Sequence, residues 1–219
     1  PNQPQLIILR GKDGKRIFQD EQDYQYFHSC LEAAAYNYET LVHAYVLLPD
    51  QVQFLVTPKL VNGIARCLQS IGRNYVQYFN ECYGDAGSLW EGRYRATVVD
   101  IKPYLLTCCR YIELSPVRAR LVRTPDRYRW SSFAHNAGDR HDEMITAHRE
   151  YLNLGRDAQS RRLAYRALFK NRISRDTADW ITESALKGWA LGDIGFARRI
   201  EKRSGRRAAQ LPRGRPAAS

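Results

Sequence analysis

A β-hairpin is predicted where two apolar runs, residues 41–48 and 51–57, are separated only by Pro49 and Asp50. Proline and aspartate are frequent turn residues, because proline fixes one backbone angle and the aspartate side chain can bond to the backbone of the turn. Two strands joined by so short a turn run antiparallel. The chain is therefore expected to contain an antiparallel sheet.

Strands and helices alternate on both sides of this hairpin. An apolar run at residues 5–9 predicts the first strand, and apolar residues at helical spacing predict the helices. We expect helices at about 21–38, 61–83 and 101–114, and a fourth strand at about 95–99. The order strand, helix, two strands, helix, strand, helix is a split β-α-β pattern. It predicts an α+β fold with a ferredoxin-like core.

The formal net charge of +11 is concentrated in the last third of the chain. Residues 151–219 carry 16 lysines and arginines against 6 aspartates and glutamates, whereas residues 1–150 carry 18 against 17. Positive charge at this density favours polyanions through phosphate contacts and counterion release, so nucleic acid is the expected partner. A solvated basic surface without a partner is the alternative.

Length and apolar content set the expected domain organisation. A chain of 219 residues with 44% hydrophobic content can form one domain of ordinary size with an appendage. We expect a core domain at 1–138 and a basic helical region at 139–219 that ends in a disordered tail. Short helices are expected in this second region at about 160–170, 174–189 and 194–204.

A cytoplasmic location is expected from the apolar pattern. No apolar run approaches the roughly 20 residues that a membrane span needs, and the first residues lack the basic and apolar regions of a signal peptide. The residues His141, Asp142, Glu143 and His148 have no recognised metal spacing, and we expect them to form a solvated helix face.

Four motifs occur in a fixed order along the chain. They are the runs 42–49 (VHAYVLLP), 70–80 (SIGRNYVQYFN), 88–95 (SLWEGRYR) and 111–119 (YIELSPVRA). In this order and spacing the chain resembles the REP-associated tyrosine transposases, which are bacterial relatives of the insertion-sequence single-strand transposases in the HUH superfamily. The resemblance implies the same ferredoxin-like fold and identifies the core domain with the transposase domain.

The resemblance also implies a catalytic site. In the family, a tyrosine on the helix after the fourth strand attacks a DNA phosphate and becomes linked to the 5′ end, while two histidines and an amide residue hold a divalent ion. Tyr111 matches the nucleophile. Gln51 and Gln53 stand where the family has its two histidines, and Ser115 stands at the position of the amide residue.

These replacements weaken the expected metal site. Gln51 and Gln53 alternate across one residue and therefore share a face of the strand, and Tyr111 and Ser115 share a face of their helix. Neutral amide and hydroxyl oxygens compete poorly with water for Mg²⁺ or Mn²⁺. We therefore expect no cofactor and absent or very slow strand cleavage, because the ion supplies several kcal/mol of charge stabilisation.

The expected partner is single-stranded or hairpin DNA of the palindromic repeat class, which is the substrate that the resemblance implies. Arginines within or beside the motifs, together with aromatic residues such as Trp90 and Tyr94, offer cations interleaved with stacking surfaces. The candidate DNA-binding residues in the motifs are Arg73, Arg93, Arg95, Arg110 and Arg118. Arg213 and Arg215 belong to a Pro-Arg-Gly-Arg-Pro tail that resembles an AT-hook, a minor-groove binder.

Three functions remain open from the sequence. The first is a transposase-derived DNA-binding protein that has lost catalysis. The second is an active single-strand transposase that uses Tyr111 with Mg²⁺ or Mn²⁺ at an unusual site. The third is binding of structured RNA hairpins. A homodimer is compatible with each of them, since the resembling proteins occur as monomers and as dimers.

Overall fold

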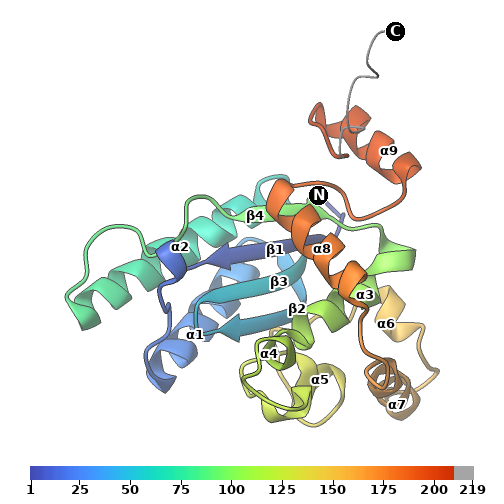
Figure 1. Ribbon diagram of the computed structural model, residues 1–219, viewed down its shortest axis with the longest axis horizontal. Helices are drawn as coiled ribbons and strands as arrows, with labels where there is room; N and C mark the ends of the chain where they lie inside the picture. The colour runs from blue at the N-terminus through green and yellow to red at the C-terminus, as the bar shows by residue number, and fades with distance from the viewer. Residues whose placement is uncertain (210–219) are drawn as a thin grey trace, which may run out of the picture.

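A computed structural model describes residues 1–209 of the chain, so the tail with Arg213 and Arg215 lies outside the described residues. Its centre is a four-stranded antiparallel sheet with the strand order β2-β3-β1-β4 (Figure 1). The strands are β1 (Gln5–Arg10), β2 (Thr40–Leu48), β3 (Gln51–Pro58) and β4 (Arg95–Val98). The predicted hairpin is confirmed as β2 and β3, which pair across the Pro49-Asp50 turn.

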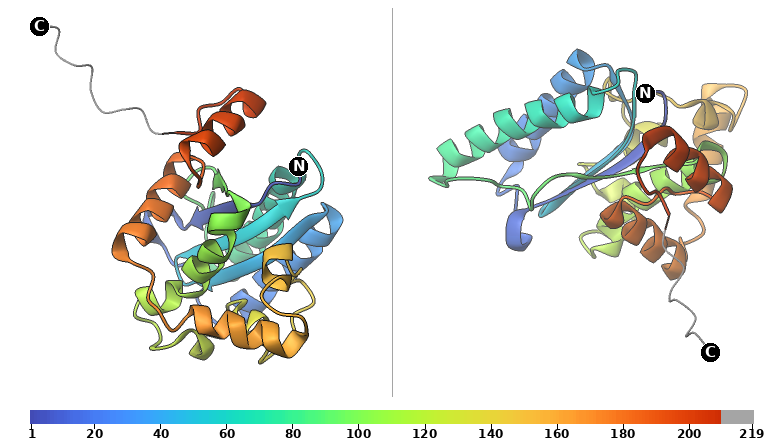
Figure 2. Two further views of the ribbon diagram at one scale, coloured as in Figure 1. Left: turned by 90° about the vertical axis from the view of Figure 1, so that its right-hand side faces the viewer. Right: turned by 90° about the horizontal axis from the view of Figure 1, so that it is seen from above.

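Helices cover both faces of the sheet (Figure 2). Helices α1 (Glu21–Asn37) and α2 (Gly63–Tyr83) pack on one face, and α3 (Ile101–Glu113) and α8 (Arg175–Lys187) pack on the other. The element order is the predicted split β-α-β arrangement with a helical C-terminal region. The α+β fold class is therefore confirmed.

The first face of the sheet holds an aromatic core. Phe27 of α1, Phe54 of β3 and Tyr75 of α2 are each at most 1% exposed. The Tyr75 hydroxyl donates to the Ile17 carbonyl at 2.5 Å, so this buried polar group is paired. Helix α1 starts at a capping box in which the Asp20 side chain accepts backbone N–H groups.

The second face is where the C-terminal region joins the core. Tyr165, Ile181 and Leu191 are at most 1% exposed and belong to the same apolar cluster as Leu6 of β1 and Leu105 of α3. The expected division at residue 138 remains a prediction. The packing shows that helices of the basic region complete the core of the sheet.

Shorter elements fill the remaining chain. They are η1 (Lys12–Gly14), α4 (Ser115–Arg118), η2 (Pro125–Arg127), α5 (Phe133–Asn136), α6 (Arg149–Leu152), α7 (Ala158–Leu168) and α9 (Ile194–Ser204). Helix α8 ends at Lys187, two residues before the predicted end, because Gly188 adopts a left-handed conformation with φ of 69° and stops the helix. Among the described helices, none has the length and apolar character needed to cross a membrane.

The prediction of a solvated helix face around Asp142 was wrong. Asp142 lies in a loop before α6 and is 9% exposed. Its carboxylate accepts a hydrogen bond from the Tyr45 hydroxyl at 2.8 Å and lies 3.4 Å from His28 Nε2. Tyr45 and His28 come from elements about 100 residues earlier, so the sequence spacing carried no sign of this contact.

Candidate functional site

The catalytic positions implied by the family lie on the sheet face that carries α3. Gln51 and Gln53 of β3 point to this face, and strand pairing places Arg10 opposite Gln51 and Ile8 opposite Gln53. Ile8 also pairs with Arg95 of β4. Directly paired residues of neighbouring antiparallel strands share a face. Gln51 therefore lies beside Arg10, whereas Ile8 lies between Gln53 and Arg95 on the same face.

A chain of hydrogen-bonding groups occupies the position at which the resemblance predicts a metal site. Ser115 Oγ lies 3.0 Å from Gln53 Oε1 and 2.9 Å from the Tyr111 carbonyl oxygen. The Arg118 guanidinium donates to Ser115 Oγ at 2.6 Å. Gln53 Nε2 lies 3.4 Å from Gln51 Oε1, at the long end of hydrogen-bond distances. The side chains of Gln53 and Ser115 thus have partners within the protein.

This arrangement does not fit a divalent ion. Each oxygen in it is neutral, whereas Mg²⁺ prefers carboxylates and water, and Mn²⁺ also accepts imidazole. The nearest fixed charge is the positive guanidinium of Arg118, which would repel a second cation at Ser115. Within residues 1–209, no three His, Cys, Asp or Glu side chains are placed to hold a metal.

Tyr111 is held by helix α8 of the C-terminal region. The residue is 4% exposed, and its hydroxyl lies 2.8 Å from Thr182 Oγ1. Thr182 donates its own proton to the Ala178 carbonyl at 2.7 Å, so the phenol is the donor in the contact with Thr182. The Arg118 guanidinium lies 4.2 Å from the centre of the Tyr111 ring. In this arrangement the phenol donates to a hydroxyl group, which is too weak a base to activate it.

A buried carboxyl group supports the same helix. Glu113 is fully buried and accepts hydrogen bonds from Ser132 at 2.6 Å, Asn136 at 2.8 Å and Tyr165 at 2.6 Å. Burial raises the pKa of Glu113 to about 7, and the three hydrogen bonds only partly oppose this rise. The network joins α3 to α5 and α7. It was not predicted from the sequence, although a glutamate within an apolar helix and the nearby Ser131-Ser132 pair were signals.

A basic pocket lies next to the two glutamines. It has a volume of about 260 Å³, and Arg10, Arg93 and Arg95 line it together with Glu91, Trp90 and Leu186 of α8. Arg93 and Arg95 were predicted from the sequence to contact DNA, and the structure brings them together. Arg10 was not predicted, although its position two residues after Ile8 places it on the same face of β1.

Trp90 separates this basic pocket from an apolar one. The second cavity has a volume of about 220 Å³ and is lined by Leu68, Gly72 and Tyr94 among others. Trp90 Nε1 is buried and has no hydrogen-bond partner within the described residues. An unpaired buried N–H costs about 1–3 kcal/mol, so an acceptor from a ligand would stabilise it. The two cavities together fit a ligand with a flat aromatic group for the apolar cavity and negative charge for the arginines of the basic pocket.

The other predicted residues lie apart from this group. Arg73 is exposed on α2, which packs on the opposite face of the sheet. Arg110 of α3 donates to the Asn171 carbonyl at 2.5 Å and thereby holds the link between α7 and α8. Arg118 is solvent-exposed, and its guanidinium stacks over the Tyr111 ring.

Comparisons with known proteins place this site in a family context. A family described as "Transposase IS200 like" matches residues 5–115, about half of the chain. No curated protein matches. One solved structure with a similar fold is a REP-associated tyrosine transposase bound to a REP hairpin, with a TM-score of 0.54 and 13% identity over 67% of this chain and 86% of that chain. A putative transposase from Deinococcus radiodurans matches with a TM-score of 0.37 and 17% identity over 54% of this chain and 84% of that chain.

The family match runs from β1 to the start of α4 and so contains the strand of the two glutamines and the helix of Tyr111. The shared fold with the REP-associated transposase agrees with it. On this match over half of its length, and in agreement with the motifs in its sequence, the chain belongs to the family of IS200-like transposases.

Proposed function

We propose that the protein binds single-stranded or hairpin DNA of the palindromic repeat class and has lost metal-dependent strand cleavage. The observation that supports this proposal is the Gln53-Ser115-Arg118 chain, in which neutral side chains and a guanidinium lie where the resemblance predicts the metal ligands. The related fold with a REP hairpin bound supports the choice of substrate class.

The basic pocket supplies the binding chemistry. Arg10 and Arg95 project from neighbouring strands on one face, where two guanidinium groups can contact successive phosphates of one strand. Trp90 at the pocket wall offers a surface on which an unpaired base can stack, which is worth about 1–3 kcal/mol per base. Unpaired bases occur in single strands and hairpin loops, so these are favoured over uniform duplex.

Loss of the metal removes the main stabilisation of a cleavage transition state. A bound divalent ion contributes several kcal/mol by neutralising the phosphate and the leaving oxygen, which corresponds to a rate factor on the order of a thousand or more. The single Arg118 guanidinium cannot coordinate both oxygens in this way. The hydrogen bond from Tyr111 to Thr182 adds a second obstacle, since it would have to break before the phenol could reach a phosphate.

Incubation of a labelled repeat hairpin with the full chain in Mg²⁺ or Mn²⁺, followed by a denaturing gel, tests the loss of catalysis. We expect no covalent adduct. A variant with Gln51→His, Gln53→His and Ser115→Asn should regain adduct formation, whereas the two histidine substitutions without Ser115→Asn should not suffice. Adduct formation by the unaltered protein that disappears in Tyr111→Phe would establish the alternative, an active tyrosine transposase.

A second experiment tests DNA binding at the basic pocket. The Arg10→Gln, Arg95→Gln double variant should bind the hairpin more weakly and with a smaller salt dependence than the wild type. Arg66→Gln is the control, because Arg66 is an exposed arginine that stacks on Tyr38 and belongs to α2, which packs on the opposite face of the sheet. Equal binding by the double variant and the wild type would contradict the proposed surface. Tighter binding of an RNA hairpin of the same sequence would favour the RNA alternative.

A further inference from the structure

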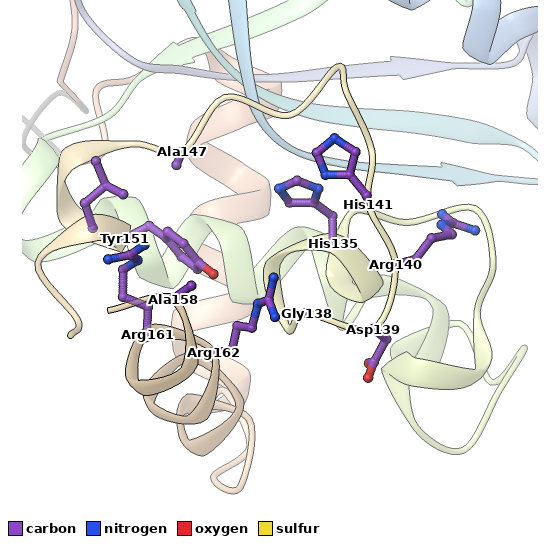
Figure 3. Close-up of a pocket in the computed structure, with 11 residues that line it drawn as sticks. His135, Gly138, Asp139, Arg140, His141, Ala147, Tyr151, Ala158, Arg161 and Arg162 are labelled. Carbon is purple, nitrogen blue, oxygen red and sulfur yellow. The ribbon is translucent and has the colours of Figure 1, made fainter. Parts of the chain in front are cut away.

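A second basic pocket lies in the C-terminal region, away from the two glutamines. It has a volume of about 260 Å³ and opens between the loop after α5 and helices α6 and α7 (Figure 3). The charged or titratable residues that line it are His135, Asp139, Arg140, His141, Arg161 and Arg162, with Tyr151 forming one wall. None of them belongs to the four family motifs.

The positive charge of this pocket is only partly compensated within the described residues. Within residues 1–209, no carboxylate forms an ion pair with Arg161 or Arg162. Asp139 also lines the pocket, but its carboxylate pairs with Arg166, and the Asp142 carboxylate of the same loop accepts from Tyr45. The pocket therefore attracts anions.

His135 of this pocket can act as a hydrogen-bond donor through Nε2. The backbone N–H of Asp142 donates to His135 Nδ1 at 2.9 Å, so Nδ1 is unprotonated in the neutral ring and Nε2 carries the proton. Burial lowers the pKa of His135; the Asp142 carboxylate opposes this shift, whereas the positive charges of His141 and Arg162 add to it.

The backbone makes room for Arg162. Gly138 has a φ of 87°, and a Cβ atom at this position would lie 2.1 Å from Arg162 Cδ. Only glycine has both the backbone freedom and the space that this contact needs. As a result the Arg162 side chain crosses Gly138, and Figure 3 shows its guanidinium directed between His135 and Tyr151.

We propose that this pocket binds a phosphate group, and that in the DNA complex it holds one backbone phosphate of the hairpin. Two guanidinium groups and an imidazole N–H are donors suited to the oxygens of a phosphate. The part that concerns DNA rests on the function proposed above. The phosphate chemistry rests only on the pocket.

The pocket is also connected to the helix of Tyr111. Arg161 and Arg162 lie one turn before Tyr165 on α7, and the Tyr165 hydroxyl donates to Glu113 on α3. Glu113 follows Tyr111 by two residues. DNA held at this pocket is thereby anchored on the same rigid body that presents the former nucleophile.

The salt dependence of hairpin binding tests the proposal in the full chain. The Arg161→Gln, Arg162→Gln variant should make the slope of log affinity against log salt shallower by about 0.7–0.9 for each phosphate that is no longer neutralised. The matched control is Arg198→Gln with Arg199→Gln on α9, which removes the same charge from exposed positions outside the pocket. The Arg161→Lys, Arg162→Lys variant keeps the charge and should keep most of the salt dependence of binding. It replaces the glutamine variant if that variant fails to fold.

A second measurement separates the source of the phosphate from its binding. Inorganic phosphate or pyrophosphate at constant ionic strength should raise the melting temperature of the wild type and of the α9 control, but not that of the pocket variant. Stabilisation by these anions with an unchanged DNA slope would assign the pocket to a free phosphate compound. The proposal would be overturned if phosphate and pyrophosphate did not raise the melting temperature of the wild type and if the salt dependence of hairpin binding were the same in the pocket variant and the α9 control. Failure of the wild type to bind any hairpin would refute the proposed function, and the anion measurement would still decide the pocket.

Discussion

Replacement of Glu113 with glutamine should make the stability of the protein less dependent on pH. The carboxyl group of Glu113 is fully buried and accepts three hydrogen bonds, from Ser132, Asn136 and Tyr165. Burial raises its pKa from 4.5 to about 7. The native protein therefore keeps a proton on Glu113 over a pH range in which the unfolded chain has already released it.

The sign and size of the effect follow from this difference. The stability contributed by the raised pKa is fully present below pH 4.5 and is lost as the pH rises through about 7, because unfolding then becomes coupled to proton release. At about 1.4 kcal/mol per pH unit, the interval corresponds to roughly 3 kcal/mol. Glutamine cannot ionise, and its amide can still meet part of the hydrogen bonding. The free energy of unfolding of the variant minus that of the wild type should thus increase by roughly 3 kcal/mol from pH 4.5 to pH 8.

Urea unfolding at pH 5, 6, 7 and 8 measures this difference directly. Other titrating groups are common to both proteins and cancel when the two curves are subtracted. Tyr165→Phe is a useful control, because it removes one donor to Glu113 and keeps the carboxyl group. If the difference between Glu113→Gln and the wild type stays constant across this pH range, the carboxyl group is not protonated in the native state and the reasoning fails.

Three further substitutions probe individual contacts. Tyr111→Phe should leave stability and hairpin affinity within about 1 kcal/mol of the wild type, whereas Thr182→Val should cost about 1–3 kcal/mol in urea unfolding, because the buried phenol then has no acceptor. The cost of Thr182→Val should largely vanish when it is combined with Tyr111→Phe, and a cost that persists in the double variant would show that the contact is not a hydrogen bond. Burial opposes ionisation of Asp142, but the hydrogen bonds that its carboxylate accepts from His28 and Tyr45 outweigh burial and lower its pKa from 3.8 to about 2. Asp142→Asn should therefore reduce the free energy of unfolding by about 2 kcal/mol at pH 7. The difference in stability between this variant and the wild type should disappear as the pH falls from 3.8 to about 2. Equal acid unfolding of Asp142→Asn and the wild type would exclude that contribution.

The sequence predicted the architecture because each strand and helix is indicated by a pattern within its own residues. The hairpin had a turn pair between two apolar runs, and the paired strands placed Gln51 and Gln53 on one face, as their alternation required. The helix of Tyr111 ends at Glu113, one residue before the predicted end, and Pro116 lies in the first turn of the short helix α4 that follows, where its missing N–H costs no helical hydrogen bond. In each case the cause lies within a few residues of its effect.

Contacts between distant segments could not be predicted in this way. The Tyr165 hydroxyl that donates to Glu113 is 52 residues away along the chain, and the Thr182 partner of Tyr111 is 71 residues away. Helical periodicity predicted α7 and α8 but does not say which surface an amphipathic helix covers. The same limit explains Asp142, whose partners follow from the packing of its loop against β2.

The position of the positive charge follows from the same packing. The sequence concentrates the net charge of the chain after residue 150, which invites the expectation of a detachable basic arm. The structure places Tyr165, Ile181 and Leu191 of that region in the core of the sheet, each at most 1% exposed. Burying such a side chain stabilises the fold by roughly 1.5–3 kcal/mol, so deletion of the region would expose the sheet face and unfold the protein. Charge and core therefore come from the same helices, whose exposed arginines bear the charge while their apolar faces cover Tyr111. The contribution of that charge to DNA binding can be measured only by substitution of exposed arginines in the intact chain.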